Sequence, residues 1–196
     1  MAEARGLPFG RPPTQLPKNQ FVDERRRSLV PEIFGWVSTA PIYAFDQTIT
    51  PSNGTLHLNP IGPLVTNVIV DRCRINVTTL AATTVAYTAV YLRDKDRKTL
   101  TLVPGTSAGH DATGTGVKTG NLNAPVKLLA GTDYWLAYVA VGGAPVIVGS
   151  GGTNCIMDRH AISGSFTSLP TTVLYENLAR SQGVIPGVVY YHSNSI

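Results

Sequence analysis

Residues 85–92 alternate in a way that constrains the fold of the whole chain. Apolar side chains recur at every second position on one face, and Ala86, Thr88, Val90 and Leu92 occupy the other. The charged run at 94–97 is expected to turn, and residues 99–103 return as a second strand of a hairpin. Nineteen glycines and fourteen prolines interrupt the rest of the chain and leave little room for helix. About eight or nine short strands predict an all-β, antiparallel β-sandwich (jelly-roll-like).

A second strong signal lies at residues 130–141. Gly131 and Asp133 predict a turn, and the apolar run that follows predicts a central strand in which Trp135 is largely buried. Residues 126–129 are expected to pair with this strand as a hairpin. The preceding stretch, 104–125, holds five glycines among Thr, Ser and Asn and is expected to be a long loop.

The composition divides the chain into an arm, a bridge and a body. Residues 1–31 hold five prolines and carry six basic against three acidic side chains, in a chain whose total net charge is +4. Such a segment is expected to be extended and unable to form a core alone. We therefore expect an anchoring arm at 1–31, a bridge at 32–50 and the β-sandwich domain at 51–196. The arm residues expected to contact a partner are Arg5, Leu7, Phe9, Arg11, Leu16, Phe21, Arg25, Arg26 and Arg27.

The apolar tail at 184–191 has two interpretations, which stay open at this point. It can add a strand to a neighbouring subunit, or it can complete the chain's own sheet. Only 14% of the residues are charged, against about 25% in typical domains, so part of the surface is expected to face other protein. We expect no membrane segment and no signal peptide. Cys73 and Cys155 are expected to be buried thiols.

The sequence offers little for catalysis. Its histidines lie far apart and show no metal-ligand spacing, and Asp158-Arg159-His160 is the one acidic–basic cluster that suggests a catalytic site. We therefore predict that the protein is not an enzyme and has no catalytic residue, no metal and no cofactor.

Two binding functions remain as alternatives. A coat protein could contact a packaged genome through Arg25–Arg27, but the acidic neighbours in the arm argue against nucleic acid as a partner. A host-receptor or glycan-binding module could use the expected glycine-rich loop, although that loop contains no aromatic side chain for stacking on a sugar. Its candidate contact residues are His110, Asp111, Asn121 and Asn123.

Two segments carry a resemblance to a known group of proteins. Residues 130–139 read AGTDYWLAYV, and residues 164–172 read GSFTSLPTT. This pair, within roughly residues 62–175, resembles small β-sandwich domains of tailed-bacteriophage virion proteins, which occur in tail fibres, baseplates, necks and capsid decorations. The resemblance implies a non-enzymatic structural subunit, assembled in the host cytoplasm into the virion. It implies other virion proteins as partners of the arm, and a homo-oligomer, with a trimer favoured.

Overall fold

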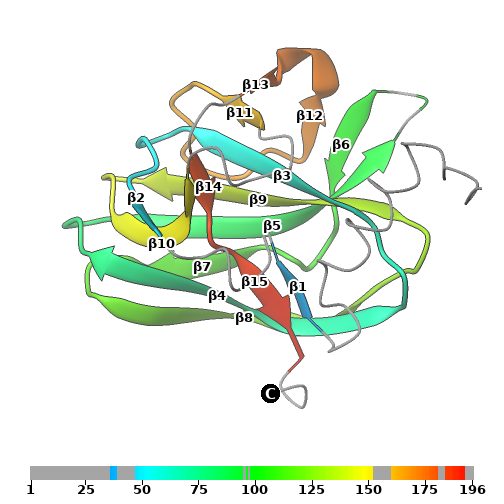
Figure 1. Cartoon of the computed structure of the whole chain (residues 1–196), viewed down its shortest axis with the longest axis horizontal. Helices are drawn as coiled ribbons and strands as arrows, with labels where there is room; N and C mark the ends of the chain where they lie inside the picture. Colours follow the sequence, from blue (N-terminus) through cyan, green and yellow to red (C-terminus); the bar gives the residue numbers. More distant parts are fainter. Residues whose placement is uncertain are drawn as a thin grey trace, which may run out of the picture.

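The computed structural model describes residues 36–38, 47–94, 96, 98–151, 160–180 and 184–192. In this part of the chain every strand pairing is antiparallel, and the strands form two sheets packed against each other (Figure 1). The single helical element of the described residues is a 3-10 turn at Tyr175–Asn177. The prediction of an all-β antiparallel sandwich with little helix is thus confirmed. The arm, residues 1–31, lies outside the described residues.

The first sheet, called sheet A here, is built around a long strand, β4. This strand pairs with β8 on one side and with β15 and β10 on the other. The seven strands of sheet A are β1 (Trp36–Ser38), β2 (Gln47–Ile49), β4 (Val68–Thr79), β8 (Gly116–Leu128), β10 (Val146–Gly151), β14 (Val184–Pro186) and β15 (Val189–Tyr191).

The second sheet, sheet B, has the central strand β9 between β5 and β3. The predicted hairpin at 85–103 is confirmed, since β5 and β6 pair directly. The eight strands of sheet B are β3 (Leu56–Pro63), β5 (Val85–Asp94), β6 (Thr99–Leu102), β7 (Ala108–Asp111), β9 (Asp133–Val141), β11 (His160–Ile162), β12 (Thr172–Leu174) and β13 (Ala179–Arg180).

The main core fills the space between the two sheets. Sheet A contributes the inward side chains of β4, including Val70, Cys73 and Ile75, and sheet B contributes Val90 and Leu136. All of these residues are at most 1% exposed. Because alternate residues of β4 and β8 point into this core, their neighbours form the outward face of sheet A.

A second apolar layer covers the other face of sheet B. Trp135 lies on this face of β9, is 2% exposed, and meets the ring of Tyr175 edge-on at 5.6 Å. Residues 163–178 pack over it, and the hydroxyl of Tyr91 donates a hydrogen bond to the carbonyl of Pro170. In Figure 1 this cover is the segment around β11, β12 and β13, above β3 and β9. Strand β9 is therefore buried on both faces, and the predictions of its central place and of a buried Trp135 are confirmed.

Two expectations about local structure are wrong. The stretch 104–125 is not a long loop, because β7 and the first ten residues of β8 lie within it. One of its glycines, Gly120, is closely packed: a Cβ there would lie 2.8 Å from the Cβ of Ala108 and 3.0 Å from the carbonyl oxygen of Gly109. Gly120 lies on β8 and Ala108 lies on β7, and these two strands can approach closely because neither residue has a large side chain.

The expected hairpin between 126–129 and 134–141 is also absent. Residues 116–128 belong to sheet A, whereas 133–141 belong to sheet B, so the connection passes from one sheet to the other. Gly131 has φ of +73°, which suits the sharp turn in this connection. For the tail, one of the two open interpretations holds: β15 pairs with β4 and β1 of the same chain.

Candidate functional site

The four residues expected to form a receptor loop are divided among different surfaces. His110 points into the core and is 1% exposed, while Asp111 beside it is exposed on the opposite face of β7. Asp111 accepts hydrogen bonds from the backbone and hydroxyl of Thr113, which lower its pKa. Asn121 and Asn123 are exposed on β8, in the other sheet. The structure does not gather these four side chains into one site.

Other residues named from the sequence lie outside the described part of the chain. They are the nine arm residues, Cys155, Asp158 and Arg159, and the side chain of His160 is not described either. Cys73, in contrast, is described and is fully buried.

His110 belongs to a polar network inside the main core. Its Nε2 lies 3.0 Å from Oγ1 of Thr88, which donates to Sγ of Cys73 at 3.2 Å. The hydroxyl of Tyr190 lies 3.0 Å from the same Oγ1 and donates to the carbonyl of Thr106 at 2.8 Å. Burial lowers the pKa of His110 to about 4 and raises that of Cys73 to about 12, so both groups are neutral near pH 7. This network joins β4, β5, β7 and β15 and serves the core.

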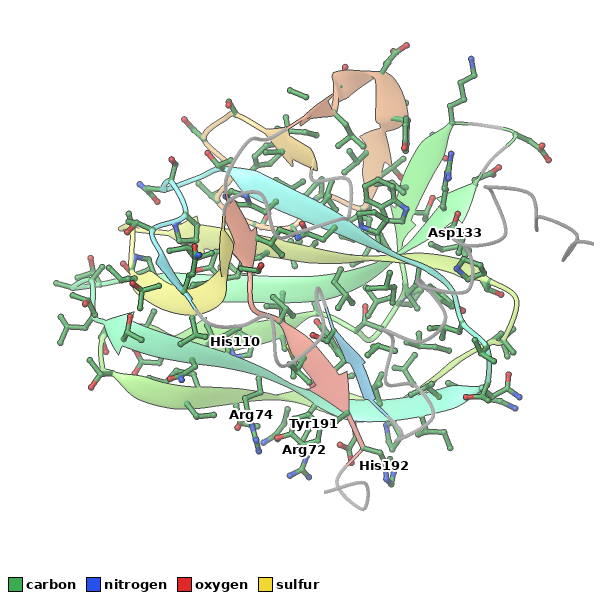
Figure 2. The ribbon with its side chains drawn as sticks, viewed as in Figure 1. Arg72, Arg74, His110, Asp133, Tyr191 and His192 are labelled. Carbon is green, nitrogen blue, oxygen red and sulfur yellow. The ribbon has the colours of Figure 1, made fainter. Side chains whose placement is uncertain are left out.

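A basic and aromatic cluster lies on the outward face of sheet A, and the sequence reasoning missed it. We call it the arginine–tyrosine cluster: Arg72, Arg74, Tyr191, Asp71 and His192. Figure 2 shows Arg72, Arg74, Tyr191 and His192 together, away from Asp133. The strand register brings the tyrosine to the arginines, because Tyr191 lies opposite Arg72 in the β4–β15 ladder. The spacing of the two arginines, with one residue between them on a strand, was the signal available in the sequence.

Both guanidinium groups lie over the ring of Tyr191. The Cζ of Arg74 lies 4.8 Å from the ring centroid, and its Nη2 donates to the Tyr191 hydroxyl at 2.9 Å. The Cζ of Arg72 lies 5.9 Å from the same centroid. Cation–π contacts of this kind favour a fixed guanidinium orientation. Tyr191 is 3% exposed.

Asp71 supplies the negative charge of the arginine–tyrosine cluster. Its Oδ1 accepts a hydrogen bond from Nε of Arg72 at 3.0 Å, and its Oδ2 lies 3.9 Å from Nε2 of His192. A register shift in the β4–β8 ladder falls between Val70 and Arg72, at the position of Asp71. Because a bulge re-aims a side chain, it brings the Asp71 carboxylate beside the adjacent Arg72. Among the described residues the cluster has two guanidinium groups and one carboxylate, and so a net positive charge.

A different corner of sheet A is apolar. We call Val65, Ile69 and Leu129 the apolar corner; they are 50%, 48% and 51% exposed. Ile69 lies opposite Lys127 in the β4–β8 ladder. Leu129 is two residues after Lys127 and is therefore a diagonal neighbour of Ile69. The loops that carry Val65 and Leu129 are tied together, because the N–H of Gly131 donates to the carbonyl of Leu64 at 2.7 Å.

The described residues contain no group of three or more His, Cys, Asp or Glu side chains placed to hold a metal ion. No helix in the same residues has the length and apolar character needed to cross a bilayer. The chain matches no protein-family model and none of the curated proteins with which it was compared.

Proposed function

We propose that the protein is a non-enzymatic structural subunit of a tailed-phage particle. In this proposal the segment 1–31 anchors the chain to another virion protein, and the β-sandwich forms contacts with further subunits. The resemblance of residues 130–139 and 164–172 to virion domains suggests the setting. The apolar corner is the observation in the structure that supports an assembly role best.

The apolar corner supports subunit contact because its side chains are exposed and its loops are fixed. Its three large side chains are each about half exposed, which costs free energy in water unless another surface covers them. The backbone hydrogen bond between Gly131 and Leu64 and the amide of Asn67, which accepts from the N–H of Ala130 at 2.9 Å, hold the two loops in place. A surface that is already ordered loses little entropy when a partner binds.

The self-association part of the proposal is tested by charging the apolar corner. The double variant Ile69→Lys/Leu129→Lys should fold normally, because both side chains are exposed, and should sediment as a smaller species than the unmodified protein. Leu174→Lys is the matched control: Leu174 is 45% exposed on β12 of the other sheet, and its replacement should leave the mass unchanged. Sedimentation velocity at micromolar protein measures the mass. A monomeric unmodified protein, or an unchanged oligomer in the double variant, would remove the support that the corner gives.

The virion part needs a separate experiment. An antibody against the purified chain should detect it in phage particles purified from lysates of the host that carries the gene. A chain that lacks residues 1–31 should keep a folded sandwich but should no longer enter those particles. Absence of the full chain from purified particles would contradict the proposal. Full incorporation of the chain that lacks residues 1–31 would contradict it too.

A further inference from the structure

We propose that the arginine–tyrosine cluster binds the carboxylate of an acidic saccharide on the outward face of sheet A. This inference goes beyond the proposed assembly role, because it uses other side chains of sheet A than the apolar corner. It rests on the hydrogen-bonding capacity of the cluster that no protein group in the described residues uses.

The two arginines have more donors than partners. Among the described residues, Arg72 makes one side-chain hydrogen bond, from Nε to Asp71, and its two terminal nitrogens have no partner. The side chain is 35% exposed, so these nitrogens can reach a ligand. Nε of Arg74 is buried and has no hydrogen-bond partner. A buried guanidinium N–H without an acceptor is costly, but a surface ligand has almost no access to Nε of Arg74, so the donors open to an oxyanion are the terminal nitrogens of Arg72.

The guanidinium groups are also arranged in advance. The hydrogen bond from Arg74 to the Tyr191 hydroxyl and the packing of both arginines on the Tyr191 ring limit the rotation of two long side chains. The planar fork of an arginine matches the two oxygens of a carboxylate, and a fixed fork loses less entropy on binding. A positively charged, pre-arranged pair of forks therefore favours a carboxylate ligand.

The surroundings of the pair favour a sugar over an acidic protein segment. Asn121 lies opposite Arg72 and Thr119 lies opposite Arg74 in the β4–β8 ladder, and both are exposed on this face. Asn76 follows Arg74 on the same face of β4. Amide and hydroxyl groups of this kind pair with sugar hydroxyls. The Tyr191 ring, which a protein partner would use as apolar contact area, is not available to one, because Tyr191 is 3% exposed.

The test is a titration of the full chain with small acidic sugars. D-glucuronate and N-acetylneuraminate are the probes, D-glucose is the neutral counterpart, and amide NMR shifts report binding at low salt. We expect both acids to bind with Kd on the order of 1 mM, with shifts at residues 72–74 and 119–121, and glucose to cause none. Raising the salt concentration should weaken binding, because the contact is between charges.

The chain offers a closely matched control for the variants. Arg93 is also 35% exposed, also forms an ion pair with an aspartate (Asp133, 3.3 Å), and also lies over a tyrosine ring (Tyr175, 5.0 Å). Arg72→Gln and Arg74→Gln should each weaken acid binding about tenfold or more, and Arg93→Gln should not. Because Arg72 is partly exposed, Arg72→Gln should unfold at the same urea concentration as the unmodified protein.

Four results would overturn the inference. One is the absence of shifts with either acid at about 20 mM, well above the expected Kd. Another is equal binding of glucose. The third is an equal loss of binding in Arg93→Gln and Arg72→Gln. The last is tighter binding of poly-L-glutamate or of inorganic phosphate than of both sugar acids, which would assign the arginines to a protein carboxylate or to a phosphate group instead.

Discussion

Acidification is expected to destabilise this protein through two interior histidines. His57, on β3, is 5% exposed, and neither ring nitrogen has a hydrogen-bond partner; His110 lies in the polar network of the core. Burial lowers the pKa of each imidazole from 6.5 to about 4. Between these two pH values the unfolded chain binds protons that the folded chain does not. The contribution of the two neutral histidines to stability is therefore fully present above about pH 6.5 and is lost as the pH falls toward 4.

The size of the effect follows from the shift. One pKa unit corresponds to about 1.4 kcal/mol, so each histidine should lower the free energy of unfolding by about 2 kcal/mol between pH 7 and pH 5. Together the two should remove about 4 kcal/mol, a large part of the roughly 5–15 kcal/mol that stabilises a typical domain. Among the described residues, the polar neighbours of His110 are Thr88, Tyr190, Cys73 and the backbone of Lys118, and none of these groups is a carboxylate. His57 faces Tyr138, with ring centroids 6.3 Å apart.

Urea unfolding followed by tryptophan fluorescence at pH 7, 6 and 5 measures the slope. His57→Asn and His110→Asn should each reduce the pH dependence by about half, whatever their effect on stability at pH 7, because each removes one titrating group. His192→Asn, which replaces a histidine outside the core, is the control for the substitution itself. Equal free energies of unfolding at pH 7 and pH 5 would refute the reasoning. So would an unchanged slope in both core variants.

Two further predictions concern packing. Trp135→Ala should lower the free energy of unfolding by about 3–5 kcal/mol, because a large side chain is removed from under residues 163–178; an unchanged urea midpoint would contradict this. Gly120→Ala should cost about 1–3 kcal/mol, because its Cβ would lie 2.8 Å from a side chain of β7. Gly109→Ala should cost less, since its nearest contact would be an ordinary 3.7 Å, and equal losses in the two alanine variants would argue against the close approach.

Several features of the fold could be predicted because they depend on local period and composition. The alternation at 85–92 identified β5, and the apolar run after Gly131 identified β9. The strand β8 could not be recognised in the same way. Most of its outward residues are polar and its glycines resemble those of a loop. Its strand conformation depends on pairing with β4, about fifty residues earlier in the sequence.

The candidate site depended on the same long-range pairing. Arg72 and Arg74 were ordinary basic residues in the sequence, and Tyr191 was one residue of an apolar tail. They became one cluster only when β15 paired with β4 and placed Tyr191 opposite Arg72. The receptor-loop prediction failed for a related reason: neighbours in sequence, such as His110 and Asp111, point to opposite faces of a strand.

The sequence by itself determined that the chain forms short antiparallel strands with an apolar central strand, because side-chain alternation and turn residues act over a few positions. Tertiary structure decided which strands share a sheet, that β9 is buried on both faces, and that two arginines and a tyrosine meet. The physical reason is that strand partners are chosen by the total apolar surface they bury together and by register, and neither quantity can be read from one segment alone.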